Sequence, residues 1–249
     1  MADQQPFSDI ALASNPEPRC PCVLLVDNSA SMLAVVANPG SDTGETVIRD
    51  GQTYRVASSG TTRLDLVNEG LKAYQLDLLK DDLAPQRVEV SIITFGGKVS
   101  TVVPFTSAHD FVAPTLDATG ETPMGEAIVK AIEAVEERKK VYRGNGLHYY
   151  RPWIFLITDG EPTDDWLRAA EKVRECEANK KIAFFAVGVE GANMETLQKI
   201  SVRRALNLKG YSFREMFLWL SQSQRRVSHS RPGEEDQLSI ESPAGWANL

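Results

Sequence analysis

The 249-residue sequence has no long apolar run and no basic tract, and each absence excludes a class of protein. A membrane-spanning helix needs roughly 20 consecutive apolar residues, and the apolar runs here are far shorter. Residues 1–5 have neither a basic start nor an apolar core, so they do not resemble a secretion signal. We therefore expect a cytoplasmic protein without a membrane partner. A net charge of −7 without a basic cluster argues against nucleic acid as a partner.

Cysteine and histidine are also scarce. Cys20 and Cys22 have the wrong spacing for a redox pair or a zinc knuckle, and Cys176 stands alone in a helical stretch. We expect all three to be reduced thiols in the core. The three histidines, at 109, 148 and 229, lie in separate segments and suggest no Ser-His-Asp set.

Apolar stretches of strand length alternate with amphipathic stretches of helix length along most of the chain. Strands are expected at residues 22–26, 88–95, 99–105, 153–158 and 182–189, with an edge strand near 204–208. Helices are expected at residues 62–80, 123–142, 164–179, 194–201 and 213–227. This alternation predicts an α/β fold with a doubly wound, mostly parallel six-stranded sheet, in the order 3-2-1-4-5-6, and helices on both faces. Gly96-Gly97 predicts a hairpin that makes one edge strand antiparallel.

Composition divides the chain into one domain and two flexible ends. We expect the domain at residues 20–228, a flexible arm at 1–19 and a flexible, solvated tail at 229–249. An insertion at about 33–61 contains Asp50-Gly51 between β-forming residues, which predicts a two-residue hairpin. It can be a contact surface or a decorative hairpin. The aromatic residues of segment 142–151 can form a second contact surface at the opposite edge, although packing under the sheet is the commoner explanation.

Oxygen-bearing side chains follow two of the expected strands and precede one expected helix. The five residues are Asp27, Ser29, Ser31, Thr122 and Asp159. The predicted order places the first and fourth strands side by side, so Asp27 and Asp159 should meet at the carboxyl edge of the sheet, where such folds bind ligands. A set of oxygen donors without nitrogen or thiolate suits a hard divalent cation, Mg²⁺ first and Mn²⁺ or Ca²⁺ as alternatives.

Each of these residues also has an ordinary structural explanation. The two aspartates can be solvated strand ends, and the two serines can be turn residues. Thr122, followed by Pro123, can be a helix N-cap. These explanations require three separate motifs to coincide by chance, which favours the metal site.

Three motifs in this order resemble the metal-ion-dependent adhesion site of von Willebrand factor A domains. They are Asp-x-Ser-x-Ser at 27–31, Thr-Pro-Met-Gly at 122–125 and Thr-Asp-Gly at 158–160, and the likeness extends over about residues 20–228. The resemblance implies that Ser29, Ser31 and Thr122 bind the metal through their hydroxyls, while Asp27 and Asp159 act through bound waters or hydroxyl hydrogen bonds. Segments 151–160 and 213–221 are similar to the bacterial, intracellular branch that includes the TerY-like tellurium-resistance proteins.

The same resemblance implies a non-enzymatic adaptor whose metal captures an Asp or Glu of a protein partner. Its context would be a bacterial stress, tellurite-resistance or defence system with a protein kinase and a PP2C-like phosphatase. A substrate adaptor of an AAA+ motor, as in chelatases, is an alternative. A Mg²⁺-dependent phosphotransferase is the enzymatic alternative, but Ser29 stands where such an enzyme needs a second Asp, and no Gly-x-x-x-x-Gly-Lys loop is present.

Overall fold

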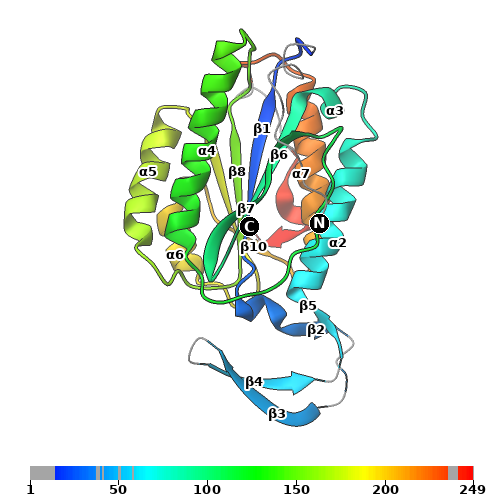
Figure 1. The fold of residues 1–249 in the computed structure, drawn as a ribbon, viewed down its shortest axis with the longest axis vertical. Helices are drawn as coiled ribbons and strands as arrows, with labels where there is room; N and C mark the ends of the chain where they lie inside the picture. Colours follow the sequence, from blue (N-terminus) through cyan, green and yellow to red (C-terminus); the bar gives the residue numbers. More distant parts are fainter. Residues whose placement is uncertain are drawn as a thin grey trace.

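A computed structural model describes residues 15–37, 40, 42–49, 52–57, 59–234 and 241–248, which are built around a seven-stranded sheet. The strands are β1 (Cys20–Val26), β6 (Val88–Gly96), β7 (Lys98–Ser107), β8 (Trp153–Thr158), β9 (Ala183–Gly188), β10 (Leu206–Leu208) and β11 (Ala247–Asn248). Their order across the sheet is β7-β6-β1-β8-β9-β10-β11 (Figure 1). The five inner strands are parallel, and the edge strands β7 and β11 are antiparallel to their neighbours.

The predicted α/β class and the order 3-2-1-4-5-6 are confirmed for the six expected strands. The seventh strand, β11, was not predicted because its two residues are too few to produce a pattern. It belongs to the segment that the sequence suggested was a solvated tail. That suggestion is wrong for Trp246 and Ala247, which are buried, while most of residues 241–248 are exposed.

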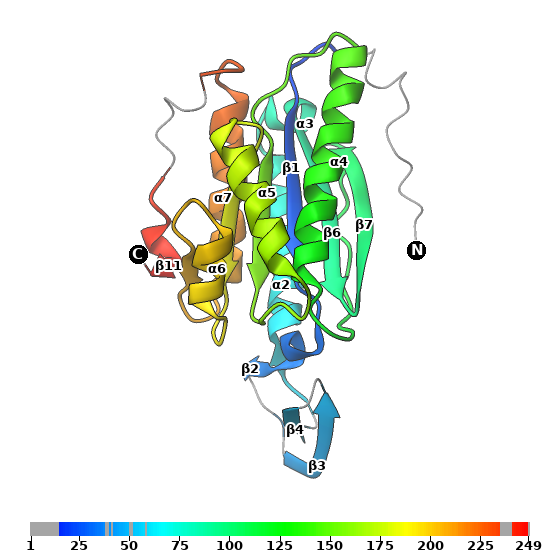
Figure 2. The ribbon, with the colours of Figure 1, turned by 90° about the vertical axis from the view of Figure 1, so that its left-hand side faces the viewer.

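Helices cover both faces of the sheet, as predicted. Figure 1 shows α2 (Arg63–Leu78), α3 (Ala84–Arg87) and α7 (Phe213–Ser228) on one side, and α4 (Met124–Gly144), α5 (Trp166–Ala178) and α6 (Met194–Ile200) on the other. Figure 2 shows α4, α5 and α6 from their outer side. Side chains alternate along β1, so Leu24 and Val26 pack on the first face and Val23 and Leu25 on the second.

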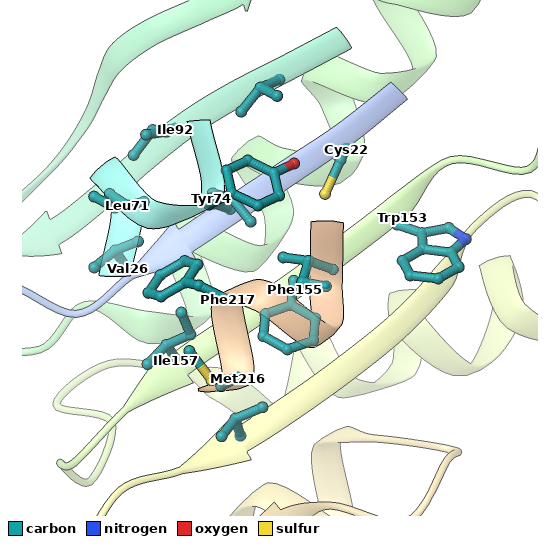
Figure 3. Close-up of a cluster of buried hydrophobic side chains, with 14 of the residues drawn as sticks. Cys22, Val26, Leu71, Tyr74, Ile92, Trp153, Phe155, Ile157, Met216 and Phe217 are labelled. Atoms are coloured by element: carbon teal, nitrogen blue, oxygen red, sulfur yellow. The ribbon is translucent and has the colours of Figure 1, made fainter. Parts of the chain in front are cut away.

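The first of these two cores is drawn in Figure 3, where Leu71 and Tyr74 of α2 face Phe217 of α7. Helix α2, which the sequence predicted at residues 62–80, has an apolar stripe that is buried from Leu64 to Leu78. The helices approach so closely that a Cβ added at Gly70 would lie 2.3 Å from the Phe217 ring. Helix α2 also contacts η1 (Ala30–Leu33), which follows β1, so the start of α2 lies near the carboxyl edge of β1.

The predicted insertion leaves the domain and returns to it at the same place. It comprises η1 (Ala30–Leu33), β2 (Val35–Ala37), β3 (Asp42–Arg49), β4 (Gln52–Ala57) and β5 (Thr61–Thr62). The Arg63 amide donates to the Ala34 carbonyl at 3.1 Å, closing the excursion. The predicted hairpin is present, with Arg49 paired to Gln52, although the turn residues themselves lie outside the described residues. Figure 1 shows it projecting from the carboxyl edge of the sheet, away from the helices.

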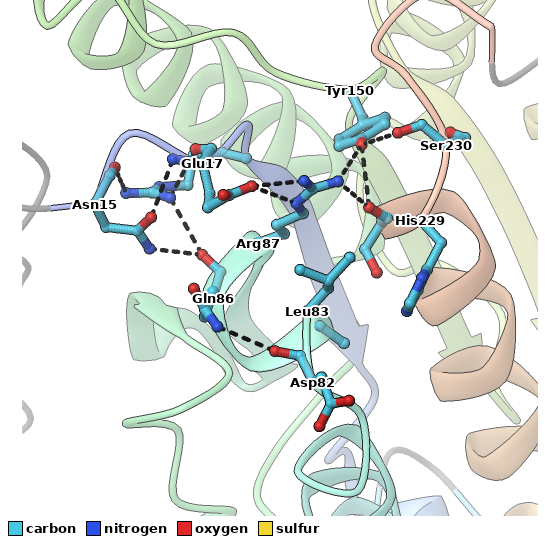
Figure 4. A network of polar contacts seen from close by, with 12 residues as sticks. Asn15, Glu17, Asp82, Leu83, Gln86, Arg87, Tyr150, His229 and Ser230 are labelled. Atoms are coloured by element: carbon cyan, nitrogen blue, oxygen red, sulfur yellow. Dashed lines mark hydrogen bonds and ion pairs between the residues drawn. The ribbon is translucent and has the colours of Figure 1, made fainter.

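At the opposite edge, the chain before β1 is held by a polar network (Figure 4). Arg87 contacts Glu17 at 2.6 Å and donates to the Tyr150 hydroxyl at 3.2 Å. Arg19 is 1% exposed and donates to the carbonyls of Asn15 and Glu17 at 2.8 Å each. The expected arm is therefore packed at residues 15–19, while residues 1–14 lie outside the described part.

Two further expectations concern buried side chains. Tyr142 and Tyr150 are fully buried, so these aromatic residues of segment 142–151 pack under the sheet. Cys20, Cys22 and Cys176 are buried, and none of the three forms a disulfide. Within the described ranges, no helix combines the length and apolar character needed to cross a membrane.

Candidate metal centre

The candidate centre lies where β1 and β8 end side by side. Val26 is paired with Ile157, and the Asp27 amide donates to the Ile157 carbonyl at 2.9 Å. This pairing brings Asp27 and Asp159 to one edge although 131 residues separate them in the chain. Both are buried, with Asp27 0% and Asp159 5% exposed. They are not the solvated strand ends of the alternative explanation.

A continuous chain of hydrogen bonds joins four of the five predicted residues. Ser29 donates its amide to Asp27 Oδ1 at 2.8 Å, and its hydroxyl lies 2.9 Å from the Ser31 hydroxyl. The Ser31 hydroxyl donates to Asp159 Oδ1 at 2.7 Å. The second Asp27 oxygen accepts from the Thr158 hydroxyl at 2.5 Å. The two serine hydroxyls are thus aimed at each other and at a carboxylate, an arrangement that a backbone turn alone does not require.

Thr122, the fifth residue, faces the same small space. A Cβ added at Gly160 would lie 3.3 Å from Thr122 Oγ1 and 3.6 Å from Asp27 Oδ2, so both oxygens line one side of Gly160. The N-cap explanation for Thr122 is wrong. Helix α4 begins at Met124, and its first amides, those of Gly125 and Glu126, are capped instead by the Asp164 carboxylate at 2.9 and 2.7 Å. The Thr122 hydroxyl is therefore not used as the helix cap.

The loop that carries Thr122 is locked to the loop that carries the serines. The Ala30 amide donates to the Gly120 carbonyl at 3.1 Å, and the Thr119 amide donates to the Asn28 carbonyl at 2.7 Å. Gly96 lies beneath both loops, where an added Cβ would lie 2.3 Å from the Asn28 and Thr119 carbonyl oxygens. The sequence predicted this glycine as part of a hairpin turn. Its close approach to two site loops was not predicted, because it depends on the tertiary structure.

The electrostatics of the site favour a cation. Burial, followed by the charge of Asp159, raises the pKa of Asp27 from 3.8 to about 6, while hydrogen bonds from Ser29 and Thr158 lower it in part. Two buried carboxylates that repel each other gain stability when a positive ion lies between or beside them. The hydroxyl and carboxylate oxygens present are the donors that a hard divalent cation binds.

Sequence reasoning missed one residue of this centre. Arg63 Nη1 lies 2.5 Å from Asp159 Oδ2, so a guanidinium already contacts one of the two acids. Nothing in the local sequence around Arg63 distinguishes it from an ordinary helix-start residue.

A comparison with known protein families identifies the family to which this fold and its three motifs belong. The model of the von Willebrand factor type A domain matches residues 22–216. The chain belongs to this family. Among curated proteins, none matches this VWA domain.

Solved structures share the fold at low sequence identity. The PilB minor pilin from Streptococcus sanguinis has a TM-score of 0.53 at 12% identity, covering 91% of this chain and 64% of its own. Proximal thread matrix protein 1 from the mussel byssus has a TM-score of 0.51 at 13% identity, covering 84% of this chain and 49% of its own. An aerotolerance-related membrane protein from Bacteroides fragilis has a TM-score of 0.50 at 17% identity, covering 83% of this chain and 99% of its own. The VWA domain thus spans about half of the mussel protein and just under two thirds of the pilin.

Proposed function

We propose that this VWA domain is a non-enzymatic adaptor that binds a protein partner through a divalent cation, with Mg²⁺ as the first candidate and Mn²⁺ or Ca²⁺ as alternatives. The hydroxyls of Ser29, Ser31 and Thr122 would hold the ion, and Asp27 and Asp159 would offset its charge. The observation that carries this proposal is the bonded chain from Ser29 through Ser31 to Asp159, because it presents hydroxyl oxygens beside a buried carboxylate.

The chemistry of the donor set supports this division of roles. A hydroxyl that donates its proton to a carboxylate keeps its lone pairs for a cation, as the Ser31 hydroxyl does toward Asp159. A bound ion with mostly neutral ligands remains electron-poor, so it attracts an anionic group from outside. A mussel byssus structure, with a TM-score of 0.50 at 13% identity, has a zinc-occupied MIDAS motif, which supports a divalent cation here.

The partner proposed is a protein that offers an exposed Asp or Glu. The likeness of segments 151–160 and 213–221 to TerY-like proteins supports a bacterial stress or tellurite-resistance setting, with a protein kinase or a PP2C-like phosphatase as the partner. The oxygen-only, hydroxyl-rich set supports a docking role, because Ser29 stands where a phosphotransferase of the alternative type needs its second Asp.

Metal binding is tested by thermal unfolding of chelator-stripped protein. Mg²⁺ or Mn²⁺ at millimolar concentration should raise the Tm, because a ligand bound only by the native state stabilises it. Thr122→Ala should reduce the rise, since it removes one hydroxyl ligand. Thr163→Ala is the matched control, because this exposed threonine lies in the adjacent loop and contacts the Thr122 loop through its backbone amide. A wild-type protein whose Tm does not respond to either ion contradicts the metal site.

Partner binding is tested with the protein that co-purifies from the native host. Its affinity should be lost in EDTA, and an alanine scan of its acidic residues should find one whose loss costs about 2 kcal/mol or more. Affinity that is indifferent to EDTA would mean that the partner binds elsewhere on the domain.

A further inference from the structure

Arg63 is fixed at the rim of the candidate centre by the backbone on both sides of it. Thr62 and Asp65 form a reciprocal cap at the start of α2, in which the Asp65 amide donates to Thr62 Oγ1 at 3.1 Å and the Thr62 amide donates to Asp65 Oδ2 at 2.8 Å. The Arg63 amide is bonded to Ala34, at the end of η1. Since η1 begins one residue after Ser29, the same short element positions the serine ligands and the start of α2.

The Arg63 side chain points into the centre. Its Nη1 lies 2.5 Å from Asp159 Oδ2, and the side chains are 15% and 0% exposed, respectively. The other oxygen of Asp159 accepts from Ser31. One carboxylate therefore links the guanidinium to a proposed metal ligand. Arg63 Nε has no acceptor among the described residues, and the Tyr211 hydroxyl is a further polar neighbour of the guanidinium.

The charges in contact at this site determine how Arg63 acts on a metal ion and on a carboxylate that enter it. Asp27 and Asp159, when ionised, would neutralise a divalent cation. Arg63 adds one positive charge, so these three side chains and a bound divalent cation would together keep a net positive charge, while Glu190 is linked to Arg63 only through the Tyr211 hydroxyl. A neighbouring cation repels an entering metal ion and attracts an entering carboxylate, and both effects are strong where water is largely excluded.

We infer that Arg63 sets the balance between metal affinity and carboxylate affinity at this centre, weakening the first and strengthening the second. This inference rests on the proposed function, because it requires that the centre binds a divalent cation. A guanidinium that served only to hold Asp159 in place would act differently, since its removal would weaken both kinds of binding.

The first measurement is Mn²⁺ affinity by isothermal titration calorimetry on chelator-stripped protein. Arg63→Gln should bind Mn²⁺ more tightly than wild type, on the order of tenfold, because one repelling charge is gone. Arg63→Lys keeps the charge and should bind Mn²⁺ within a few-fold of wild type. Lys72→Gln removes one charge from an exposed position on the same helix and should leave the affinity unchanged. If Arg63→Gln does not fold, Arg63→Met removes the charge with an unbranched apolar side chain and replaces it in the test.

The second measurement is acetate affinity of the Mn²⁺-loaded proteins, followed by the water-proton relaxation rate, which falls when a carboxylate displaces metal-bound water. Acetate should bind Arg63→Gln several-fold more weakly than wild type. Opposite changes in the two affinities support the inference. Equal or weaker Mn²⁺ binding by the neutral variant, with wild type binding normally, overturns it and leaves the proposed function intact. No Mn²⁺ binding by any of the proteins overturns the proposed function, and the inference with it.

Discussion

At the scale of single residues, Asp27 shows a conflict between stability and the proposed function. Its carboxylate is fully buried near a second buried acid, and its pKa is raised to about 6. An acid whose folded-state pKa lies above its unfolded value destabilises the fold when it is ionised. That penalty is absent below the unfolded pKa of 3.8 and complete above about pH 6.

The substitution Asp27→Asn tests this conflict. In EDTA, the variant should be more stable than wild type above pH 6, by up to about 3 kcal/mol, and the difference should vanish below pH 3.8. Mg²⁺ should reverse the order above pH 6, since wild type alone gains a stabilising ligand. The measurement is urea unfolding across this pH range with and without Mg²⁺. Asp165→Asn, at an exposed position in a nearby loop, is the control and should show neither effect. An Asp27→Asn variant that is less stable at every pH contradicts the prediction.

At the scale of elements, the β3–β4 hairpin is separable from the domain. Its flanks are joined by the pairing of Val35 with Thr62 and by the Arg63–Ala34 hydrogen bond, so the excursion is closed without it. It also carries Ile48, a residue that is 75% exposed. Because the hairpin projects from the edge that carries the metal centre, this apolar side chain is accessible to a partner bound at that edge.

Replacing residues 47–56 with a short Gly-Ser linker should leave the fold and Mg²⁺ binding nearly unchanged. Partner binding should weaken, because the hairpin projects from the same edge as the metal centre. Ile48→Ser tests the same point without shortening the chain and should weaken binding in the same direction. Circular dichroism, the Mg²⁺-induced Tm change and partner affinity are the measurements. Full partner affinity in both folded variants would mean that the hairpin does not take part in partner binding.

At the scale of the whole molecule, the carboxyl-terminal segment completes the sheet. β11 pairs with β10, and the Trp246 ring lies 5.3 Å from the ring of Trp219 on α7. Trp219 also donates its ring N–H to the Glu241 carbonyl at 2.8 Å. These contacts cover the edge of β10 and one end of the first core, so residues 241–248 contribute to the stability of the domain.

Trp246→Ala should lower the free energy of unfolding by about 3 kcal/mol, a typical cost of removing a buried aromatic side chain. Asn248→Ala, at an exposed position on the same strand, should cost less than about 0.5 kcal/mol. Chemical denaturation in EDTA measures both without a contribution from metal. A Trp246→Ala variant as stable as wild type would show that this segment does not contribute to the fold.

The sequence by itself determined the elements and their order. The inner strands were predicted from short continuous apolar runs, and α2 from an amphipathic pattern with a period of 3.6 residues, and both are local properties of the chain. Because parallel strands end at one edge, these elements also predicted that Asp27 and Asp159 would meet. The contact of Ser31 with Asp159 agrees with that prediction, and metal binding by the five residues stays a prediction.

Only the tertiary structure decided the features that join distant segments without a local pattern. Asp164 caps α4 from 39 residues away, β11 reaches β10 across 39 residues, and Arg63 contacts Asp159 across 96. Aspartates, short polar segments and helix-start arginines occur throughout any chain, so their local sequence does not single out these three. Each contact forms because the packed sheet and helices bring two distant segments together, and this happens only once the core has formed.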